Sequence, residues 1–367
     1  MSNDGGVTTD ATTLRLGVVD GDGIGREIVP AARRVVDEAL AVVRAPAVDW
    51  VPATMGHAAI DEHGDPLPDA TMTVLDGVDG WLMGPHDSAS YPPEVRNGPP
   101  PGGAIRKRFD LFANVRPARA FVGVRAMAPE MDLVIVRENS EGLYADRNMF
   151  AGAGEFMPTP DVALSVGVVT RAATERIAHH AFRLARSRRR HVTIVHKANV
   201  LSMTTGLFLD VCREVGKSYP DVTVDAEHVD AMAAHLVRRG ADFDVVVAEN
   251  LFGDILSDLA GELSGSLGTA ASLNCSATQA MAQAAHGAAP TIAGHNRANP
   301  TAMILSAAML LHWLAERRAD ASLRQAAERI EHAVAATFEA GIATADLGGL
   351  VSTSEFTENV TARVHRR

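Results

Sequence analysis

Residues 14–43, LRLGVVDGDGIGREIVPAARRVVDEALAVV, decide the fold class of this chain. The apolar run 14–19 has the length of a strand, and the glycines of 21–25 predict a tight loop after it. Apolar residues then recur at helical spacing through 27–43. A strand, a loop and a helix in this order form the repeating unit of a largely parallel sheet, so the stretch favours an α/β fold.

Apolar runs of strand length alternate with longer helical stretches along the rest of the chain. We expect further strands at Trp81–Met83, Leu133–Arg137, Val162–Val169, Val192–His196 and Phe243–Val247. The segment 84–103 contains six prolines, which exclude a regular helix or a central strand there. We therefore predict an irregular loop over a site at 84–103.

Length, charge and cysteine usage limit the classes of function. The chain has 367 residues, a length that predicts about two domains. Its formal charge of -11 disfavours nucleic acid as a partner. No apolar stretch approaches a membrane span, and the polar start of the chain lacks a signal core. The two distant cysteines support neither a disulfide framework nor a cysteine metal site, so we expect a soluble, cytoplasmic protein without a membrane partner.

A pair of aspartates follows the strand predicted at 243–247. Asp254 and Asp258, in the motif NLFGDILSD (250–258), are four residues apart, which places both carboxylates on one face of a helix. Paired oxygen ligands suit a hard cation such as Mg²⁺ or Mn²⁺. The alternative is that both aspartates only cap and solvate the first helical turn.

Basic side chains at other predicted strand ends are candidates for substrate chemistry. Lys197, one of only three lysines, follows a strand at the carboxyl end where open α/β sheets place ligands, and it is a candidate proton relay. Arg106, Arg116 and Arg137 lie beside loop and strand ends, where they can converge on carboxylates. The alternative for all four is an ordinary surface position.

Two glycine-containing loops are candidates for nucleotide binding. The first, 21–25, has the spacing GxGxG without an acidic ribose partner, which is weak evidence for a Rossmann site. The second, HGAAP at 286–290 followed by Asn299, could form a backbone cradle for a nucleotide. Taken alone, each segment is equally compatible with a turn or loop.

Together, these segments resemble the β-decarboxylating hydroxyacid dehydrogenases, the family of isocitrate, 3-isopropylmalate, homoisocitrate and tartrate or D-malate dehydrogenases. The resemblance covers nearly the whole chain. The matching segments are GDGIG (21–25), DLFANVRP (110–117), RENSEGLY (137–144), HKANV (196–200), NLFGDILSD (250–258), and HGAAP with ANP (286–290 and 298–300).

The resemblance implies an α/β fold of two domains that is not a Rossmann fold, with the active site in the cleft between the domains. Residues 1–111 and 265–367 would form a large, discontinuous cofactor-binding domain. Residues 112–264 would form a smaller domain with the metal site and the dimer interface. The protein would be a homodimer with shared active sites.

The resemblance also implies roles for individual residues. Tyr144 and Lys197 would handle protons, with Lys197 supplied by the partner subunit. Three arginines would bind the carboxylates of a dicarboxylate substrate: Arg106, Arg116 and Arg137. Three aspartates would hold Mg²⁺ or Mn²⁺: Asp254 and Asp258 of one subunit and Asp230 of the other. The cofactor would lie against His286, Gly287, Ala288, Ala289, Pro290, Thr291 and Asn299.

The implied reaction is metal-dependent oxidative decarboxylation of a 3-substituted malate with hydride transfer to NAD or NADP, as in 3-isopropylmalate dehydrogenase. Residues 97–105, NGPPPGGAI, carry neither the leucines of isopropylmalate enzymes nor the Ser and Asn of isocitrate enzymes. Gly102 and Gly103 therefore predict a roomier pocket. Tartrate, D-malate, homoisocitrate or a specialised malate remain alternative substrates. Polar contacts could come from His86, Asp87, Ser88 and Tyr91.

The expected cofactor is NAD, with NADP as an alternative. Thr291 and Ile292 stand where NAD-using relatives have an Asp and NADP-using relatives have a Lys and a Tyr. The missing Lys-Tyr pair favours NAD, whereas Arg297 could meet a 2'-phosphate. Gln283 replaces a usual Glu.

Two other functions compete with this one. A non-catalytic regulatory subunit of the same fold is disfavoured because the proton-handling and metal-binding residues are all present. A metal-dependent hydrolase would explain the aspartate pair but not the three arginines.

Overall fold

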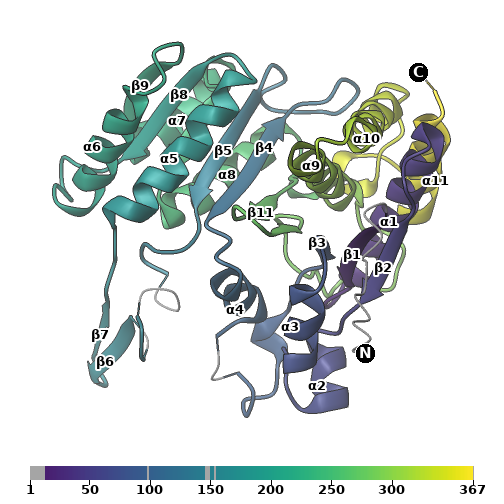
Figure 1. The fold of residues 1–367 in the computed structure, drawn as a ribbon, viewed down its shortest axis with the longest axis horizontal. Coiled ribbons are helices and arrows are strands. Elements are labelled where there is room, and N and C mark those ends of the chain that lie inside the picture. The colour runs from purple at the N-terminus through teal and green to yellow at the C-terminus, as the bar shows by residue number, and fades with distance from the viewer. Residues whose placement is uncertain (1–12, 97–98, 145–148, 153, 367) are drawn as a thin grey trace, which may run out of the picture.

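The computed structural model describes residues 13–96, 99–144, 149–152 and 154–366, so the polar start of the chain lies outside the described residues. Ten strands form one sheet in the order β2-β1-β3-β12-β11-β4-β5-β10-β8-β9. This large sheet with helices on both sides confirms the α/β fold class (Figure 1). In chain order the strands are β1 (Leu14–Val19), β2 (Val48–Pro52), β3 (Gly80–Met83), β4 (Ala113–Arg119), β5 (Asp132–Glu138), β8 (His191–His196), β9 (Thr223–His228), β10 (Val245–Ala248), β11 (Leu273–Cys275) and β12 (Ala280–Ala282).

The sheet consists of two parallel blocks joined by antiparallel strands. β2, β1, β3 and β12 are parallel, as are β5, β10, β8 and β9. Between the blocks, β11 pairs antiparallel with β12 and β4, and β4 pairs antiparallel with β5. The two blocks therefore run in opposite directions, unlike the parallel sheet of a Rossmann fold.

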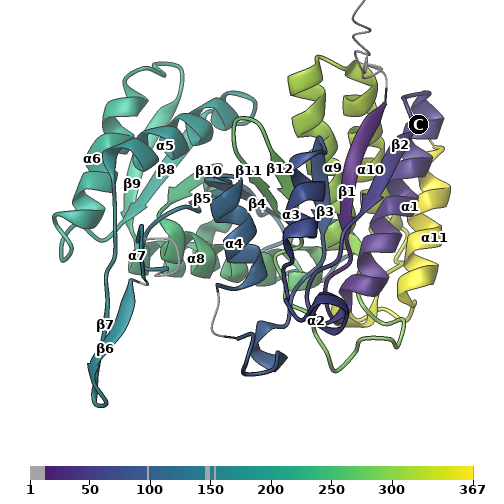
Figure 2. The same ribbon diagram turned by 60° about the horizontal axis from the view of Figure 1, so that its bottom comes forward.

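Helices pack against both parallel blocks of the sheet (Figure 2). α1 packs on α9, α10 and α11, so the first helix of the chain lies against the last three. The helices are α1 (Gly25–Val43), α2 (His57–His63), α3 (Asp69–Asp76), α4 (Pro101–Arg108), α5 (Arg171–Arg186), α6 (Thr204–Gly216), α7 (Val229–Arg239), α8 (Asn250–Ser264), α9 (Thr301–Arg318), α10 (Ala321–Glu339) and α11 (Thr353–Val364).

The sequence of β5 is almost continuously apolar because both faces of the strand are buried. Val134 and Val136 join the large core that includes residues of α5 and α6, whereas Leu133 and Ile135 join a second core with residues of α7 and α8. Successive side chains of a strand point to opposite faces, so both faces of β5 are buried. The strand is thereby fixed firmly enough to hold a charged side chain near its carboxyl end.

Two sequence-based expectations need correction. The strand predicted at 162–169 ends at Ser165: β7 (Val162–Ser165) pairs only with β6 (Glu155–Thr159), and this exposed hairpin projects away from the sheet. The prolines of 84–103 do not exclude helix throughout, because α4 begins at Pro101. Proline is well suited to a first helical position, where its fixed φ fits and its missing N–H costs no hydrogen bond.

Candidate active site

Two buried arginines lie on neighbouring antiparallel strands. Asn114 of β4 is paired with Arg137 of β5, and Arg116 lies two residues further along β4. Side chains two residues apart share a face of the sheet, so Arg116 and Arg137 point to the same side. α8 packs closely on that side, because a Cβ on Gly253 would lie 2.7 Å from the Cβ of Arg137.

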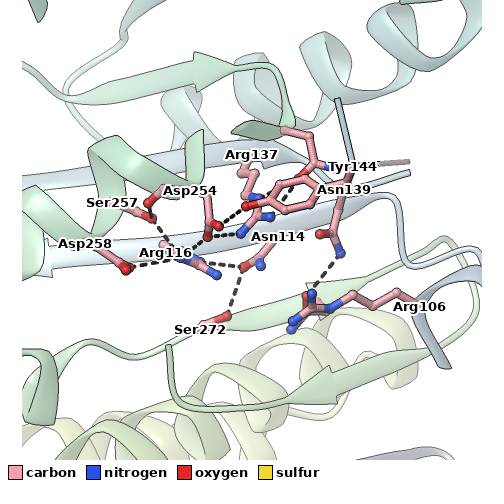
Figure 3. A network of polar contacts seen from close by, with 12 residues as sticks. Arg106, Asn114, Arg116, Arg137, Asn139, Tyr144, Asp254, Ser257, Asp258 and Ser272 are labelled. Atoms are coloured by element: carbon pink, nitrogen blue, oxygen red, sulfur yellow. Dashed lines mark hydrogen bonds and ion pairs between the residues drawn. The ribbon is translucent and has the colours of Figure 1, made fainter. Parts of the chain in front are cut away.

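This packing places Asp254 of α8 against both guanidinium groups (Figure 3). Nη1 of Arg116 lies 3.1 Å from its carboxylate, and Arg137 and the Tyr144 hydroxyl donate to the same group. Burial alone would raise the pKa of Asp254, but the two guanidiniums and the tyrosine hydrogen bond hold it below its usual value. Asp254 is therefore an anion shared by three donors.

Asp258 lies one helical turn further along α8 and is more exposed. Its Oδ1 is 3.3 Å from Nη1 of Arg116. Burial raises the pKa of Asp258, Arg116 opposes that shift, and the neighbouring Asp254 charge reinforces it. Two crowded carboxylates with hard oxygen donors, 30% and 51% exposed, fit a divalent cation that would relieve their repulsion.

Residues that the sequence reasoning did not single out hold the arginines in place. Asn250 accepts hydrogen bonds from Nε and Nη2 of Arg137 at 2.9 and 2.7 Å, and it donates to the carbonyl of Glu141. Ser257 accepts from Nη1 of Arg116 at 2.8 Å. Both belong to the same motif as the aspartates, so a helix beginning at Asn250 with its polar face toward the sheet was the available signal.

Arg106 joins this site from α4, because it lines a cavity of about 190 Å³ together with Arg116. Its Nη2 donates to Oε1 of Gln283 at 3.0 Å. Gln283 directly follows β12, and His86 follows the neighbouring parallel strand β3 by three residues. Loops after adjacent parallel strands meet at one edge of the sheet, which explains why both side chains line the cavity.

A second cavity, of about 610 Å³, shares His286 and Gly287 with the first. Ala289 and Asn299 also line it, whereas Ala288, Pro290 and Thr291 do not. Ala288 instead accepts a backbone hydrogen bond from Ile24 at 2.9 Å, which ties the loop to the first glycine loop. The remaining lining residues are Ile24, Leu267, Gly268, Ile292, Arg297, Ala345 and Asp346.

Two polar side chains of the second cavity, His286 and Asp346, are candidates to contact a ligand. Burial lowers the pKa of His286, which keeps its imidazole neutral near neutral pH. Asp346 accepts from Asn299 at 2.9 Å and from Ser266 at 2.7 Å. A neutral ring and an oriented carboxylate in a cavity of this size suit a nucleotide with free hydroxyl groups.

Lys197 and Asp230 form a separate pair. Nζ of Lys197, just after β8, lies 2.5 Å from the carboxylate of Asp230 in the first turn of α7. In the described part of the chain, no three His, Cys, Asp or Glu side chains are gathered as a metal site, so Asp230 does not join Asp254 and Asp258 within one copy. Within one copy, Arg116, Arg137 and Tyr144 are thus gathered with Asp254 and Asp258. Lys197 and Asp230 contact each other but do not join this group.

Comparison with known proteins places this geometry in a family. The model of the isocitrate/isopropylmalate dehydrogenase family matches residues 15–360. The chain belongs to the isocitrate/isopropylmalate dehydrogenase family. It is 44% identical to an isocitrate/homoisocitrate dehydrogenase of Thermus thermophilus, over 94% of this chain and 97% of that protein. It is 40% identical to a 3-isopropylmalate dehydrogenase of Archaeoglobus fulgidus, over the same shares of the two chains.

The fold agrees with a solved member of the family. The crystal structure of isocitrate dehydrogenase from Methylococcus capsulatus matches 96% of this chain and 100% of that chain, with a TM-score of 0.85 and 40% sequence identity. The protein is therefore a decarboxylating dehydrogenase of the isocitrate/isopropylmalate dehydrogenase family with that family's fold. In its described residues, no helix is both long and apolar enough to cross a membrane.

The aspartate held between the arginines predicts a pH-dependent stability. Asp254→Asn should lower the free energy of unfolding by about 1–3 kcal/mol at neutral pH, because two buried cations lose their counter-charge. Since the folded-state pKa of Asp254 lies below the ordinary 3.8, its contribution is present above pH 3.8 and is lost as the pH falls through that depressed value.

Urea unfolding of the metal-free protein across this pH range measures both effects. Asp258→Asn is the matched control on the same helix, and it should not destabilise the protein at neutral pH because the pKa of Asp258 is raised. Equal stability of the wild type and Asp254→Asn at neutral pH would contradict the assignment.

Proposed function

We propose that the protein oxidises a 3-substituted malate at C2 and releases CO₂, with NAD as hydride acceptor and Mg²⁺ or Mn²⁺ as the metal. The observation that supports the proposal is the buried group of Arg116, Arg137, Tyr144 and Asp254, together with Arg106, which lines a cavity with Arg116. Guanidinium groups bind carboxylates through paired hydrogen bonds, so this arrangement suits a dicarboxylate.

The chain supplies a group for each proton in the reaction. A lysine amine near C2 accepts the hydroxyl proton as hydride leaves for the nicotinamide, which yields a 2-oxo acid. The bond from C3 to its carboxylate then breaks, and the Tyr144 hydroxyl donates a proton to C3. A divalent cation bound to Asp254 and Asp258 would act as a Lewis acid on the oxygens of C1 and C2.

The amine in this mechanism would be Lys197 of the partner subunit, since the chain's own Lys197 and Asp230 are not gathered with Asp254 and Asp258. We therefore propose a homodimer with shared active sites, in which Asp230 of the partner subunit completes the metal site. Apolar side chains available for an interface are exposed on the β6–β7 hairpin and around Lys197. They are Phe156, Met157, Leu164, Val200, Leu201 and Met203.

We also propose the domain division 1–111 with 265–367 for the cofactor and 112–264 for the metal and the interface. The packing of α1 on α11 supports a domain built from both chain ends. We propose the cytoplasm as its location. Cys212 and Cys275 are both buried and unpaired in the described chain, as suits a reducing compartment.

NAD is the proposed cofactor because the cavity of about 610 Å³ contains the carboxylate of Asp346. A carboxylate accepts from ribose hydroxyls but repels a 2'-phosphate, and it can compensate for Thr291, which does not line the cavity. Arg297 lines the same cavity and is the group that would favour NADP.

An absorbance assay of nicotinamide reduction tests the proposed function. Isocitrate, homoisocitrate, 3-isopropylmalate, tartrate and D-malate are each supplied with NAD or NADP and with Mn²⁺. We expect turnover with at least one substrate, CO₂ released in equal amount, a higher kcat/KM with NAD, and loss of activity with a chelator. Inactivity on all five would contradict these substrates and point to a specialised malate, or to a regulatory subunit of this fold.

Lys197→Ala should leave a folded dimer whose kcat falls about 100- to 10,000-fold, because the proton acceptor is lost. Lys217→Ala is the matched control, since Lys217 lies at the end of α6 and does not line either cavity. Circular dichroism and sedimentation verify fold and assembly. Near-normal turnover of Lys197→Ala would refute its role.

Asp346→Asn should weaken NAD binding about tenfold and raise the affinity for NADP relative to NAD, because a negative charge leaves the cavity. Calorimetric titration with each nucleotide measures both constants. The control is Asp242→Asn, an exposed aspartate that lines neither cavity. An unchanged NADP-to-NAD ratio would show that Asp346 does not set the preference.

A further inference from the structure

Gly102 and Gly103 have no side chains and therefore predict an open pocket at the start of α4. In the structure, the imidazole of His86 lies at this position. A Cβ on Gly102 would lie 2.8 Å from Nε2 of His86 and 3.3 Å from its Cδ2. Gly102 and Gly103 are both buried. The glycines therefore do not open a roomier pocket at this position, because the imidazole of His86 fills the volume that a side chain at 102 would take.

The same imidazole lines the cavity that Arg106 and Arg116 also line. Arg106, Arg116, Gln283 and Ser272 give this cavity polar walls, and its other lining residues are Pro85, Ala284, Ala285, His286 and Gly287. In the described part of the chain, no Leu, Ile, Val or Phe side chain lines it. A branched alkyl group placed here would meet few apolar atoms, and it would remove water from polar groups without replacing their hydrogen bonds.

His86 is held in a fixed orientation. Its Nδ1 lies 2.8 Å from Oγ of Ser88. Burial, together with the neighbouring Arg106 charge, lowers the pKa of His86, so the imidazole is neutral near neutral pH. When Ser88 donates to Nδ1, the ring proton resides on Nε2, so the ring offers a donor on the side that lies toward Gly102.

Another candidate in the same loop is committed elsewhere. The Tyr91 hydroxyl donates to Oδ2 of the buried Asp22 carboxylate at 2.6 Å, and the backbone N–H of Asp87 donates to the same oxygen at 2.9 Å. Tyr91 does not line the substrate cavity. His86 is thus the side chain of this loop that both borders the cavity and stands over α4.

We propose that His86 selects the substituent at C3 of the substrate, favouring one that accepts a hydrogen bond, a carboxylate or a hydroxyl, over an alkyl group. The inference rests on the proposed function, because the three arginines must first hold the two carboxylates common to all malates. His86 lies beside Arg106, so an acceptor there receives hydrogen bonds from a neutral ring and a cation. Gln283 adds no negative charge next to Arg106.

Replacement of His86 by a leucine of similar size tests the selection. The readout is the ratio of kcat/KM for isocitrate, homoisocitrate or tartrate to kcat/KM for 3-isopropylmalate. We expect His86→Leu to lower this ratio about 10- to 100-fold, since a site that loses its hydrogen-bond donor loses discrimination. His63→Leu, at the exposed end of α2, should leave the ratio unchanged.

Gly102→Ala provides a second variant in which residue 86 is intact. Its Cβ would displace the His86 ring, so we expect a change of ratio in the same direction as in His86→Leu. The double variant should be little different from His86→Leu alone, because both substitutions act on one interaction. Thermal unfolding verifies that each variant is folded.

The outcomes separate this inference from the proposed function. A wild type that reduces NAD with none of the substrates would contradict the proposed substrates, on which the inference rests, whatever the properties of His86→Leu. An active wild type whose substrate ratio is unchanged in His86→Leu, or which already prefers 3-isopropylmalate, would overturn the role of His86. The ratio among the three polar substrates distinguishes a carboxylate from a hydroxyl.

Discussion

The site depends on one carboxylate shared by two buried cations. The side chains of Arg116 and Arg137 are only 8% and 3% exposed, and both contact Asp254. Guanidinium groups in such surroundings require a nearby anion, because their lost hydration is otherwise uncompensated. Any substrate carboxylate that binds these arginines must therefore compete with Asp254, and a cation that draws Asp254 toward itself would free them. In the proposed function, this competition would couple the binding of a dicarboxylate to the binding of a divalent metal.

The sheet determines where the arginines and Asp254 lie. The arginines come from the antiparallel strands that join the two parallel blocks, and α8 brings the aspartates over them because Gly253 permits close contact. The loops after β3 and β12 add His86 and Gln283 from the other block. The cavity thus lies where the two blocks meet, and the second cavity adjoins it at His286 and Gly287. Binding groups from distant parts of the sequence converge because the sheet reverses direction here.

Much of this arrangement could be predicted from local patterns. The spacing of Asp254 and Asp258 and the apolar strand before Arg137 determine local structure, and the structure has both features as expected. The start of α4 at Pro101 was missed because proline excludes a helix interior but not its first turn. Two other features were missed for a different reason. They are the position of His86 over Gly102 and the position of Asp346 in the second cavity. Their positions depend on which loops meet across the sheet, and that pairing has no local sequence signal.

In the proposed enzyme, a second copy of the chain completes each active site. A dimer with one Lys197→Ala subunit and one Asp254→Asn subunit tests it directly, once it is purified through two different affinity tags. Each parent homodimer should be inactive. In the mixed dimer, one site combines an intact Asp254 with an intact Lys197, so the account predicts about half of the wild-type turnover per dimer. A mixed dimer as inactive as its parents would show that Lys197 and Asp254 must act within the same chain, and would contradict the account.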